Sequence, residues 1–366
     1  MGIKIGFASD LGVDSAQIMK FYSDYWVRRI ALADGRFHAW QFVDPPSNNA
    51  KNTCVVALRD SVLLGVMGLN KRQFNTYGQV KLGAELTTWI VDKRFTMLGI
   101  GARILSFVKD QFDFLVGMGI SVEALPIYLR SDFRFLRFIP RYIFVVDKAR
   151  ILELSKCAPY AKKIVRDGLT KLGPISYEKI KWGEMQMSPK VEGNHFSRAR
   201  EDLIWRYDNH PYFTYQSFAV RSQSADNDYG YVILRAETAG DIRMLHVIDI
   251  LGTRDTFESS VRFIEAYAHR EGYWAADIFS TYSSLNKHFV NRGWLSAVDD
   301  SFINVPYLYH PLEIREPSTT SLIYWSKDMN ANIFDISELY ITKQDADLDR
   351  PTQKFIENAH CSNSPS

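Results

Sequence analysis

The residues with the clearest chemical potential are two glycines placed between a strand-like run and a helical pattern. Residues 83–91 alternate in hydrophobicity, and Gly99-Ile100-Gly101-Ala102 follows at the start of a helix predicted over residues 99–112. The first N–H groups of a helix have no partner within it and carry partial positive charge, so they can bind a pyrophosphate. Glycine lets the phosphate approach the backbone more closely than a side chain would. The spacing predicts a phosphate-binding turn, with a plain glycine turn as the alternative.

Two familiar nucleotide-binding motifs are absent from the sequence. The P-loop pattern Gly-x-x-x-x-Gly-Lys-[Ser/Thr] does not occur in the chain. The dinucleotide fingerprint needs a third glycine three residues after Gly101, and Ile104 stands there. The sequence therefore disfavours both of these classes of nucleotide-binding protein.

The glycine segment resembles the acyl-CoA site of the GCN5-related N-acetyltransferases, whose motif is Gln/Arg-x-x-Gly-x-Gly/Ala. Gly99 and Gly101 match the two glycine positions, whereas Thr96 departs from the first position and Arg94 lies two residues before it. The resemblance covers residues 1–145, with a decayed second copy over residues 197–310. It implies acetyl-CoA as the donor and a V-shaped opening between the fourth and fifth strands. It also implies that the donor contacts Trp89, Ile90, Val91, Thr96, Met97, Leu98, Gly99, Ile100, Gly101 and Ala102.

Glu85 is the predicted general base. Acyl transfer from a thioester to an amine requires that the amine lose a proton. Glu85 opens the strand that carries the acyl end of the donor, and partial burial there would raise the pKa of its carboxyl group. Such a carboxylate could deprotonate an ammonium directly or through water. The alternative is a salt bridge to Lys81 or Arg94 at the edge of the sheet.

Tyr128, in a short helix predicted over residues 124–130, matches the tyrosine of the family's short C-terminal helix. A phenol with a pKa of about 10 can give a proton to the departing thiolate, because the proton need move only in the transition state. The alternative is a packed core tyrosine with a satisfied hydroxyl group. Asp132 departs from the glycine that is usual after this helix.

In the second copy, Phe289 stands at the Tyr128 position and cannot donate a proton. The turn that corresponds to the phosphate turn has one glycine and an unfavourable Asp255. We expect this copy to lack CoA, and to be structural or to form one wall of the acceptor cleft.

Four residues are predicted to bind the acceptor: His38, Gln41, His246 and Asp249. The first two follow the first helices, where the family has its acceptor-binding loop. Trp40 between them could stack on a base or sugar ring, or it could be a core residue, as its repeat partner Trp205 suggests. The other two lie on one face of a strand and could point into a cleft or face solvent at an edge.

Other catalytic and metal-binding patterns are missing. The eight His are scattered and the three Cys lie far apart, so no metal site is expected. No Gly-x-Ser-x-Gly elbow occurs, so a nucleophile triad is unsupported.

The helices and strands that carry these residues belong to an internal repeat. Trp40 and Pro46 recur as Trp205 and Pro211 at one constant offset, and residues 65–69 recur at the same offset. In the first half, the predicted helices and strands span residues 14–33, 53–58, 62–69, 83–91, 99–112, 114–117 and 124–130. In the second half, they span residues 218–220, 230–236, 243–251, 256–270, 275–281 and 283–292.

The order of these elements predicts an α/β fold, with mixed sheets flanked by helices in two tandem domains that resemble GCN5-related N-acetyltransferases. The predicted division is an N-terminal catalytic domain (1–147), a connector (148–196), a degenerate second domain (197–343) and a loosely ordered polar tail (344–366).

Composition limits the partners. The chain has 366 residues, of which 46% are hydrophobic, and its 44 Lys and Arg nearly balance its 42 Asp and Glu. This excludes a disordered chain and leaves no strong field for nucleic acid or an anionic membrane. We see no signal peptide and no apolar run long enough to span a membrane, and we expect a cytoplasmic protein that could form a homodimer.

The sequence therefore predicts a CoA-dependent N-acetyltransferase. More distantly, the whole chain resembles two-copy members encoded with bacterial surface-polysaccharide genes, which implies a nucleotide-linked amino sugar as the acceptor. The alternatives are an aminoacyl or long-acyl transferase that acts on a cell-wall peptide, and a non-catalytic acyl-CoA-binding scaffold.

Overall fold

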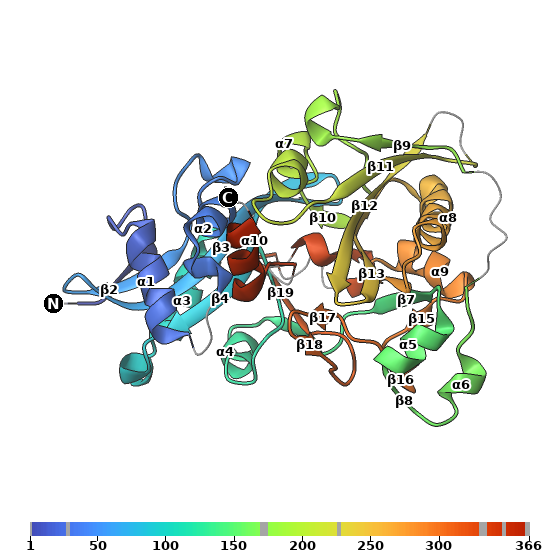
Figure 1. The fold of residues 1–366 in the computed structure, drawn as a ribbon. Helices are drawn as coiled ribbons and strands as arrows, with labels where there is room; N and C mark the ends of the chain where they lie inside the picture. Colours follow the sequence, from blue (N-terminus) through green and yellow to red (C-terminus); the bar gives the residue numbers. More distant parts are fainter. Residues whose placement is uncertain are drawn as a thin grey trace.

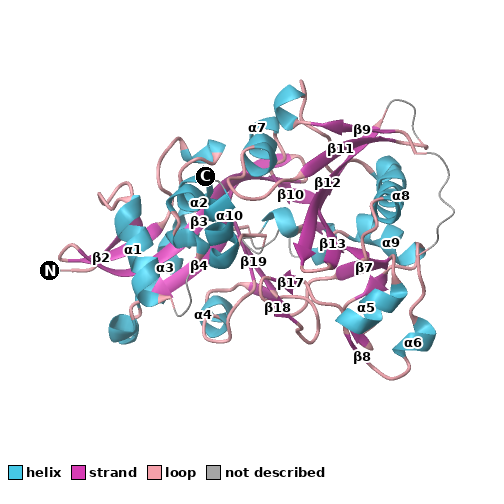
Figure 2. Ribbon diagram, in the orientation of Figure 1, coloured by secondary structure: helices cyan, strands magenta, loops and turns pink. Residues whose placement is uncertain are grey.

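Two mixed β-sheets form the framework of the protein. A computed structural model describes residues 2–26, 30–168, 175–224, 228–328, 335–345 and 349–362. Figure 1 shows β2, β3 and β4 of the first sheet on the left and β11, β12, β13 and β7 of the second sheet on the right. Helix α10 (Gln353–Ser362) lies in the centre of this view. Figure 2 shows the strands of both sheets with helices beside them, as the sequence predicts.

The first sheet has the strand order β1-β2-β3-β4-β5-β19-β6. Strands β1 to β4 pair antiparallel, whereas β4 and β5 run parallel. Short strands β10 (Asn194–Phe196) and β20 (Leu339–Tyr340) extend the sheet beside β3. The path strands are β1 (Lys4–Phe7), β2 (Val55–Arg59), β3 (Val62–Thr76), β4 (Gln79–Val91), β5 (Phe114–Met118), β6 (Arg134–Leu136) and β19 (Leu322–Ser326).

Helices cover both faces of the first sheet because alternate strand residues are apolar on each face. Helices α1 (Ser15–Tyr25) and α2 (Gly35–Phe42) pack on the face that carries Val56 and Val66. Helices α3 (Ile100–Gln111) and α4 (Leu125–Arg130) pack on the opposite face, which carries Val55 and Leu64. The glycine turn at the start of α3 is thereby fixed against the sheet.

The second sheet repeats this plan, with the order β15-β7-β14-β13-β12-β11-β9. Helices α8 (Arg254–Arg270) and α9 (Ser283–Asn291) bury Val261, Ile264 and Phe289 against it. Its strands are β7 (Arg141–Val145), β9 (Tyr177–Ile180), β11 (Gln216–Arg221), β12 (Tyr229–Ala239), β13 (Ile242–Leu251), β14 (Ala275–Phe279) and β15 (Leu295–Ser296). The shorter elements are α5 (Lys148–Leu154), β8 (Lys156–Cys157), α6 (Ala161–Ile164), α7 (Arg200–Leu203), β16 (Ile303–Asn304), β17 (Leu308–Tyr309) and β18 (Leu312–Glu313).

Each sheet contains a strand from the other half of the chain. Strand β7 comes from the first half of the chain but pairs with β14 and β15 of the second sheet. Strand β19 comes from the second half but lies between β5 and β6 of the first sheet. Each sheet is therefore complete only when both halves of the chain are present.

Both sheets contain a bulge followed by an opening between parallel strands. The register of β3 and β4 shifts between Met67 and Leu69, which gives β4 one extra residue. Strands β4 and β5 stop pairing after Leu86 and Gly117, although β4 continues to Val91. The same shift occurs between β12 and β13, and pairing of β13 with β14 ends at Val247. The first sheet thus has the predicted V-shaped opening, and its repeat has an equivalent one.

The repeated tryptophans contact each other. The rings of Trp40 and Trp205 stack with centroids 5.1 Å apart. Each indole N–H donates to the other residue's carbonyl oxygen, at 2.9 Å from Trp40 and 2.7 Å from Trp205. Such a reciprocal contact is the signature of approximate two-fold symmetry, so the repeat is also a structural one. Trp40 is a buried residue of this interface.

The segment that starts at Gln344 differs from the predicted loose tail. Lys343, Gln344, Asp345 and Asp349 are buried between the halves of the chain, and α10 follows. The polar composition that suggests a tail instead supplies ion pairs: Asp345 binds Arg198, and Asp349 binds Arg235. Charged residues of this segment are therefore part of the interior.

Candidate functional site

A cleft of about 1060 Å³ opens at the end of β4. One wall consists of the end of α1 and the end of β4. The opposite wall consists of β12, the segment 307–315 and the segment that leads into α10. Its aromatic lining residues include Trp26, Trp89, Phe213, Tyr307, Tyr309 and Phe355, and its charged ones are Asp24, Asp92, Lys93, Arg94, Arg235, Glu237, Glu313, Arg315 and Arg350. Both halves of the chain therefore build this cleft.

Strand β4 brings its free edge into the cleft. Trp89, Ile90 and Val91 line it, and they lie beyond the point where β4 and β5 stop pairing. Backbone groups on an unpaired strand edge can bond an extended ligand as a further strand would. This part of the predicted donor site thus has a suitable place in the structure.

The glycine turn has the expected conformation. A 3-10 helix (Lys93–Leu98) leads to Gly99, whose φ of 64° is left-handed, and the first α-helical bond of α3 runs from Arg103 N–H to Gly99 O at 3.1 Å. The N–H groups of residues 100–102 therefore lie at the N-terminal end of the helix. Nothing lies within 4 Å of a Cβ built on Gly99, and Met97 is 95% exposed. The turn is accessible to a ligand.

The packing of Trp89 gives a second reason why residue 101 is a glycine. A Cβ at this position would lie 2.8 Å from Cζ2 of Trp89, so the glycine makes room for the indole ring. The same ring packs against Tyr128, with centroids 5.3 Å apart. The indole N–H of Trp89 is buried and lacks a hydrogen-bond partner among the described residues. A buried donor of this kind is suited to an acceptor atom of a ligand.

These observations fit an acyl-CoA. Coenzyme A would need an open strand edge for its pantetheine arm and free N–H groups for its pyrophosphate, and β4 and the start of α3 offer both. The unsatisfied Trp89 N–H adds a hydrogen-bond donor in the same opening.

Asp92 and Arg94 form a fixed polar group at the rim of the cleft. Arg94 contacts both carboxylate oxygens of Asp92, with Nη2 at 2.7 Å, and the Tyr25 hydroxyl donates to Asp92 at 2.9 Å. Hydrogen bonds from Arg94 lower the pKa of Asp92 to about 2, although burial opposes this. Arg94 is therefore a partner of Asp92 rather than of Glu85.

Glu85 lies in a buried ion pair. It is 3% exposed, it pairs with Arg72, and it accepts a hydrogen bond from Asn70 at 3.1 Å. Burial raises the pKa of the Glu85 carboxyl group, while the Arg72 guanidinium acts in the opposite direction. The residue faces a narrow cavity rather than the cleft, and Arg350 lines both spaces.

Tyr128 is a buried residue of the core on α4. It packs between Trp89 and Phe133, and burial raises the pKa of its hydroxyl group. No hydrogen bond joins this hydroxyl to any residue that the structure describes. In the repeat, Phe289 packs on Trp294 as Tyr128 packs on Phe133. The correspondence between the two positions is therefore structural as well.

The predicted acceptor residues do not meet in one place. His38 is fully buried and contacts the Leu32 carbonyl oxygen and Asn52. Gln41 lines the narrow cavity together with Glu85, and its side-chain oxygen is buried without a partner among the described residues. Neither residue belongs to the cleft as the described residues form it.

His246 and Asp249 lie in the buried charge network of the second half. His246 bonds Asp277, and Asp249 accepts from Arg198 at 2.7 Å and from Tyr340 at 2.7 Å. Both residues are 0–1% exposed and lie outside the cleft as it is described.

The chain itself occupies the opening of the second sheet. The Tyr340 hydroxyl accepts the N–H of Ile250 at 3.2 Å, beyond the point where β13 leaves β14. On the other side, the N–H of Thr281 donates to Ile341 at 3.2 Å. Residues 339–342 therefore bond to both strand ends at the opening of the second sheet.

One polar pair on the cleft wall has no counterpart in the sequence predictions. His310 Nε2 lies 2.8 Å from Oε1 of Glu237, and both residues line the cleft. Their separation of 73 positions gives no spacing signal, and Tyr309-His310-Pro311 matches no motif. Only the approach of the segment 307–315 to β12 brings them together.

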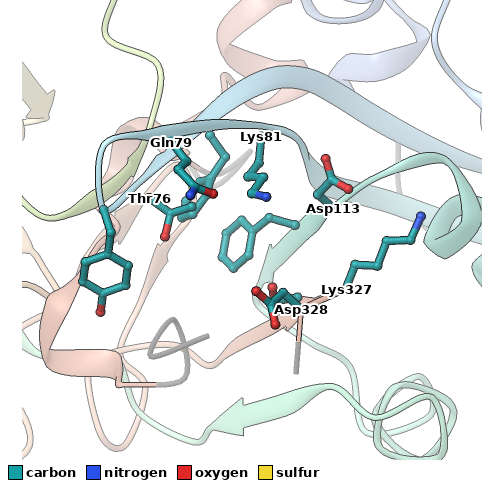
Figure 3. A pocket seen from close by; sticks show the side chains of 10 residues that line it. Thr76, Gln79, Lys81, Asp113, Lys327 and Asp328 are labelled. Carbon is teal, nitrogen blue, oxygen red and sulfur yellow. The ribbon is translucent and has the colours of Figure 1, made fainter. Parts of the chain in front are cut away.

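A second pocket, of about 440 Å³, lies at the other end of the first sheet. Figure 3 shows Thr76 and Gln79 on its left, Lys81 and Asp113 at the top and upper right, and Lys327 and Asp328 lower down. The Asp113 carboxylate accepts a hydrogen bond from the N–H of Leu82 at 3.1 Å, so it binds the backbone of β4.

Two classes of feature are not seen in the described part of the chain. No group of three or more His, Cys, Asp and Glu side chains is placed to hold a metal ion. No helix within these residues has both the length and the apolar character that a bilayer span requires.

Comparison with solved structures identifies the fold of this chain. No protein-family model and no curated protein matches the sequence. An Enterococcus faecalis V583 protein of unknown function, described as a probable N-acyltransferase, is 10% identical, with a TM-score of 0.53 over 89% of this chain and 72% of that one. A GCN5-related N-acetyltransferase from Kribbella flavida is also 10% identical, with a TM-score of 0.51 over 89% and 71%. This likeness concerns the fold, and it confirms the predicted fold class.

Proposed function

We propose that this chain, which has the fold of the GCN5-related N-acetyltransferases, transfers an acyl group from acyl-CoA to the amino group of a small acceptor. The observation that carries the proposal is the opening between β4 and β5, which is followed by an accessible glycine turn and leads into the cleft. Acetyl-CoA is the default donor. The fold alone would not define a function, so the proposal depends on these local features.

In this proposal the donor lies along the free edge of β4. The backbone of Trp89, Ile90 and Val91 pairs with the pantetheine arm, and the turn from Thr96 to Ala102 holds the pyrophosphate. Bound acyl-CoA supplies the acyl group as a reactive thioester. The opening between β13 and β14 of the second sheet does not bind a donor in this proposal, because residues 339–342 bond to its strand ends.

The roles of Glu85 as the base and Tyr128 as the acid stay predictions. Burial keeps Tyr128 as a neutral phenol that can donate a proton, and its contact with Trp89 places it beside the donor strand. Glu85 lines the narrow cavity rather than the cleft, and Arg350 lines both spaces, so a proton from the cleft has to cross that cavity to reach Glu85. Water in that cavity would have to carry the proton.

The proposed acceptor is an amino sugar linked to a nucleotide. Aromatic rings such as Trp26 and Phe213 offer stacking surfaces for a base or a sugar, and Arg315, with a half-exposed side chain, offers a guanidinium for a phosphate. This cleft, rather than His38 or His246, supports that choice.

Donor binding can be tested by thermal stabilisation with CoA. Gly99→Glu should abolish the stabilisation, because a carboxylate would repel the pyrophosphate at the start of α3. Gly240→Glu is a matched control: Gly240 has a φ of 63°, against 64° at Gly99, and nothing lies within 4 Å of its Cβ position. If CoA at millimolar concentration does not raise the Tm of the wild-type protein, or if both variants respond alike, the proposed donor site is wrong.

The acceptor can be tested by thiol release. Acetyl-CoA is mixed with UDP-, GDP- and dTDP-linked amino sugars, and the free thiol of CoA is measured. Release that depends on one amino sugar would support an acetyltransferase. CoA binding without release for any amine would favour the non-catalytic scaffold.

A further inference from the structure

The part of the cleft that the second half of the chain contributes contains a histidine, His310, with a partly exposed side chain. His310 lines the same cleft as the end of β4, and its side chain is 32% exposed. Its ring also packs against Phe355 of α10, with centroids 6.1 Å apart. The imidazole is therefore both held in place and open to a ligand.

The partner of His310 fixes its tautomer. Glu237 as a carboxylate can only accept, so His310 Nε2 carries the hydrogen in the 2.8 Å contact. The neutral ring then has its lone pair on Nδ1. No residue in the described ranges donates to Nδ1. That nitrogen is free to take a proton from a molecule in the cleft.

Arg235 helps to keep the side chain of Glu237 negatively charged. Arg235 donates to its other oxygen at 2.8 Å and also binds Asp349 at 2.9 Å. Burial alone would raise the pKa of Glu237, but Arg235, with His246 and His310, lowers it. A carboxylate at this position accepts the Nε2–H of His310 and thereby fixes the orientation of the ring.

Other charged groups also act on His310. The groups that line the same cleft are Arg235 and Glu237 from the second sheet, Glu313 and Arg315 from its own segment, Arg350 from the C-terminal segment, and Asp24, Asp92, Lys93 and Arg94 from the end of α1 and the end of β4. His246 lies 3.8 Å from Glu237, and Asp349 pairs with Arg235.

Accessibility distinguishes this pair from Glu85. The Glu85 carboxylate is already bound by Arg72 and Asn70 and is 3% exposed. A base must come within hydrogen-bond reach of the proton that it removes. His310 lines the cleft itself and is 32% exposed, so a ligand in the cleft can approach it directly.

We propose that His310 is the general base of the acyl transfer and that Glu237 is its positioning residue. This inference rests on the proposed function. The Nδ1 atom takes a proton from the ammonium of the acceptor, and the resulting amine forms a C–N bond with the thioester carbonyl carbon. The C–S bond then breaks, the predicted acid Tyr128 gives its proton to the thiolate and regains one from the nitrogen, and the imidazolium releases its proton to solvent.

The test compares the pH dependence of kcat in four variants of the full chain, with acetyl-CoA and the best amino sugar of the panel. His310→Gln should lower kcat about 100-fold or more, and the acid limb of the profile should vanish. Glu237→Gln should move the acid limb to lower pH, because the carboxylate favours the protonated ring. Added imidazole should restore part of the turnover of His310→Ala.

His288→Gln is the matched control. His288 also contacts a glutamate, Glu258 at 3.1 Å, but the pair lies on α8 and α9 outside the cleft. Its kcat should stay within about twofold of the wild type, as expected for a surface change.

The outcomes separate the two proposals. If the wild type turns over and His310→Gln retains both kcat and the acid limb, or if only Glu85→Gln removes the limb, His310 is not the base and the acyltransferase function stands. If the wild type neither binds CoA nor releases thiol, the proposed function fails and takes this inference with it.

Discussion

At the scale of single residues, Arg72 connects the two halves of the chain. It is 1% exposed and pairs with Glu85 of its own sheet and with Asp345 at 3.3 Å, and it also bonds the carbonyl of Ser197. A buried ion pair is weak evidence for a net gain in stability, but the loss of one partner leaves an uncompensated charge.

We expect Arg72→Met to lower the free energy of unfolding by about 3–5 kcal/mol, because the buried carboxylate of Glu85 loses its ion-pair partner and Asp345 loses one of its two arginines. Urea denaturation measures this. Lys20→Met is the control: it removes an exposed i,i+4 pair with Asp24 and should cost only about 0.3–0.5 kcal/mol. Equal effects of the two variants would contradict the role given to Arg72.

His38 shows why a residue predicted to bind the acceptor is part of the core. Its Nδ1 lies 3.2 Å from the Leu32 carbonyl oxygen, and its Nε2 lies 3.0 Å from Asn52 Nδ2. A carbonyl only accepts, so Nδ1 carries the hydrogen and Nε2 accepts from the amide. Protonation of Nε2 would set two donors against each other.

The stability of the protein should therefore fall on acidification. Burial lowers the pKa of His38 from 6.5 to about 4. Between these values the unfolded chain binds a proton that the folded chain does not, so the free energy of unfolding decreases as the pH falls, by up to about 3 kcal/mol for this residue. His38→Gln should make the plot of unfolding free energy against pH less steep over this window. An unchanged slope would show that His38 is not buried as a neutral ring.

At the scale of elements, the start of α3 depends on the fit between Gly101 and Trp89. We expect Gly101→Ala to cost about 1–3 kcal/mol, because a Cβ at 2.8 Å from the indole forces the ring to move. It should also weaken the thermal stabilisation by CoA.

A double variant tests the cause. Trp89→Phe removes the ring atom that the new Cβ would meet, so Gly101→Ala with Trp89→Phe should cost less than the sum of the two single changes. Strict additivity in thermal unfolding would show that the two residues do not interact.

Elements with strong local periodicity could be predicted from the sequence. The helix expected over 99–112 is α3 (Ile100–Gln111), and the helix expected over 283–292 is α9 (Ser283–Asn291). Their apolar residues recur at helical spacing, which depends on nothing outside the element. The strand expected over 83–91 ends where β4 ends, at Val91, because the glycine turn follows.

The exchanged strands could not be assigned in the same way. Both β7 (Arg141–Val145) and β19 (Leu322–Ser326) are buried at all five positions. A strand buried on both faces shows no alternation, and its sequence does not say which sheet receives it. The residues around the cleft share this limit, since His310 and Glu237 become neighbours only through tertiary packing.

At the scale of the whole molecule, neither half closes its own sheet. In the first sheet, β6 pairs only with β19 among the described strands, and β5 pairs with β19 along its whole length. The repeat units predicted from the sequence are therefore not the same as independent folding units.

A fragment of residues 1–147 tests this. It lacks β19 and leaves β7 without the second sheet, so it should not give the dispersed NMR spectrum of a folded domain, and it should be digested by protease much faster than the full chain. A well-folded, CoA-binding fragment would contradict the dependence of the first sheet on β19.

The exchange of β7 and β19 also sets an order of events during synthesis. The ribosome delivers the amino end first, so β5 leaves it with one open edge long before its neighbour exists: Met118 must wait for Leu322. The sheet that carries the proposed donor site thus closes only after residue 322 has left the ribosome. A chain interrupted before residue 322 has its glycine turn and β4 but lacks their support, so the protein gains its site long after the elements that form it have been made.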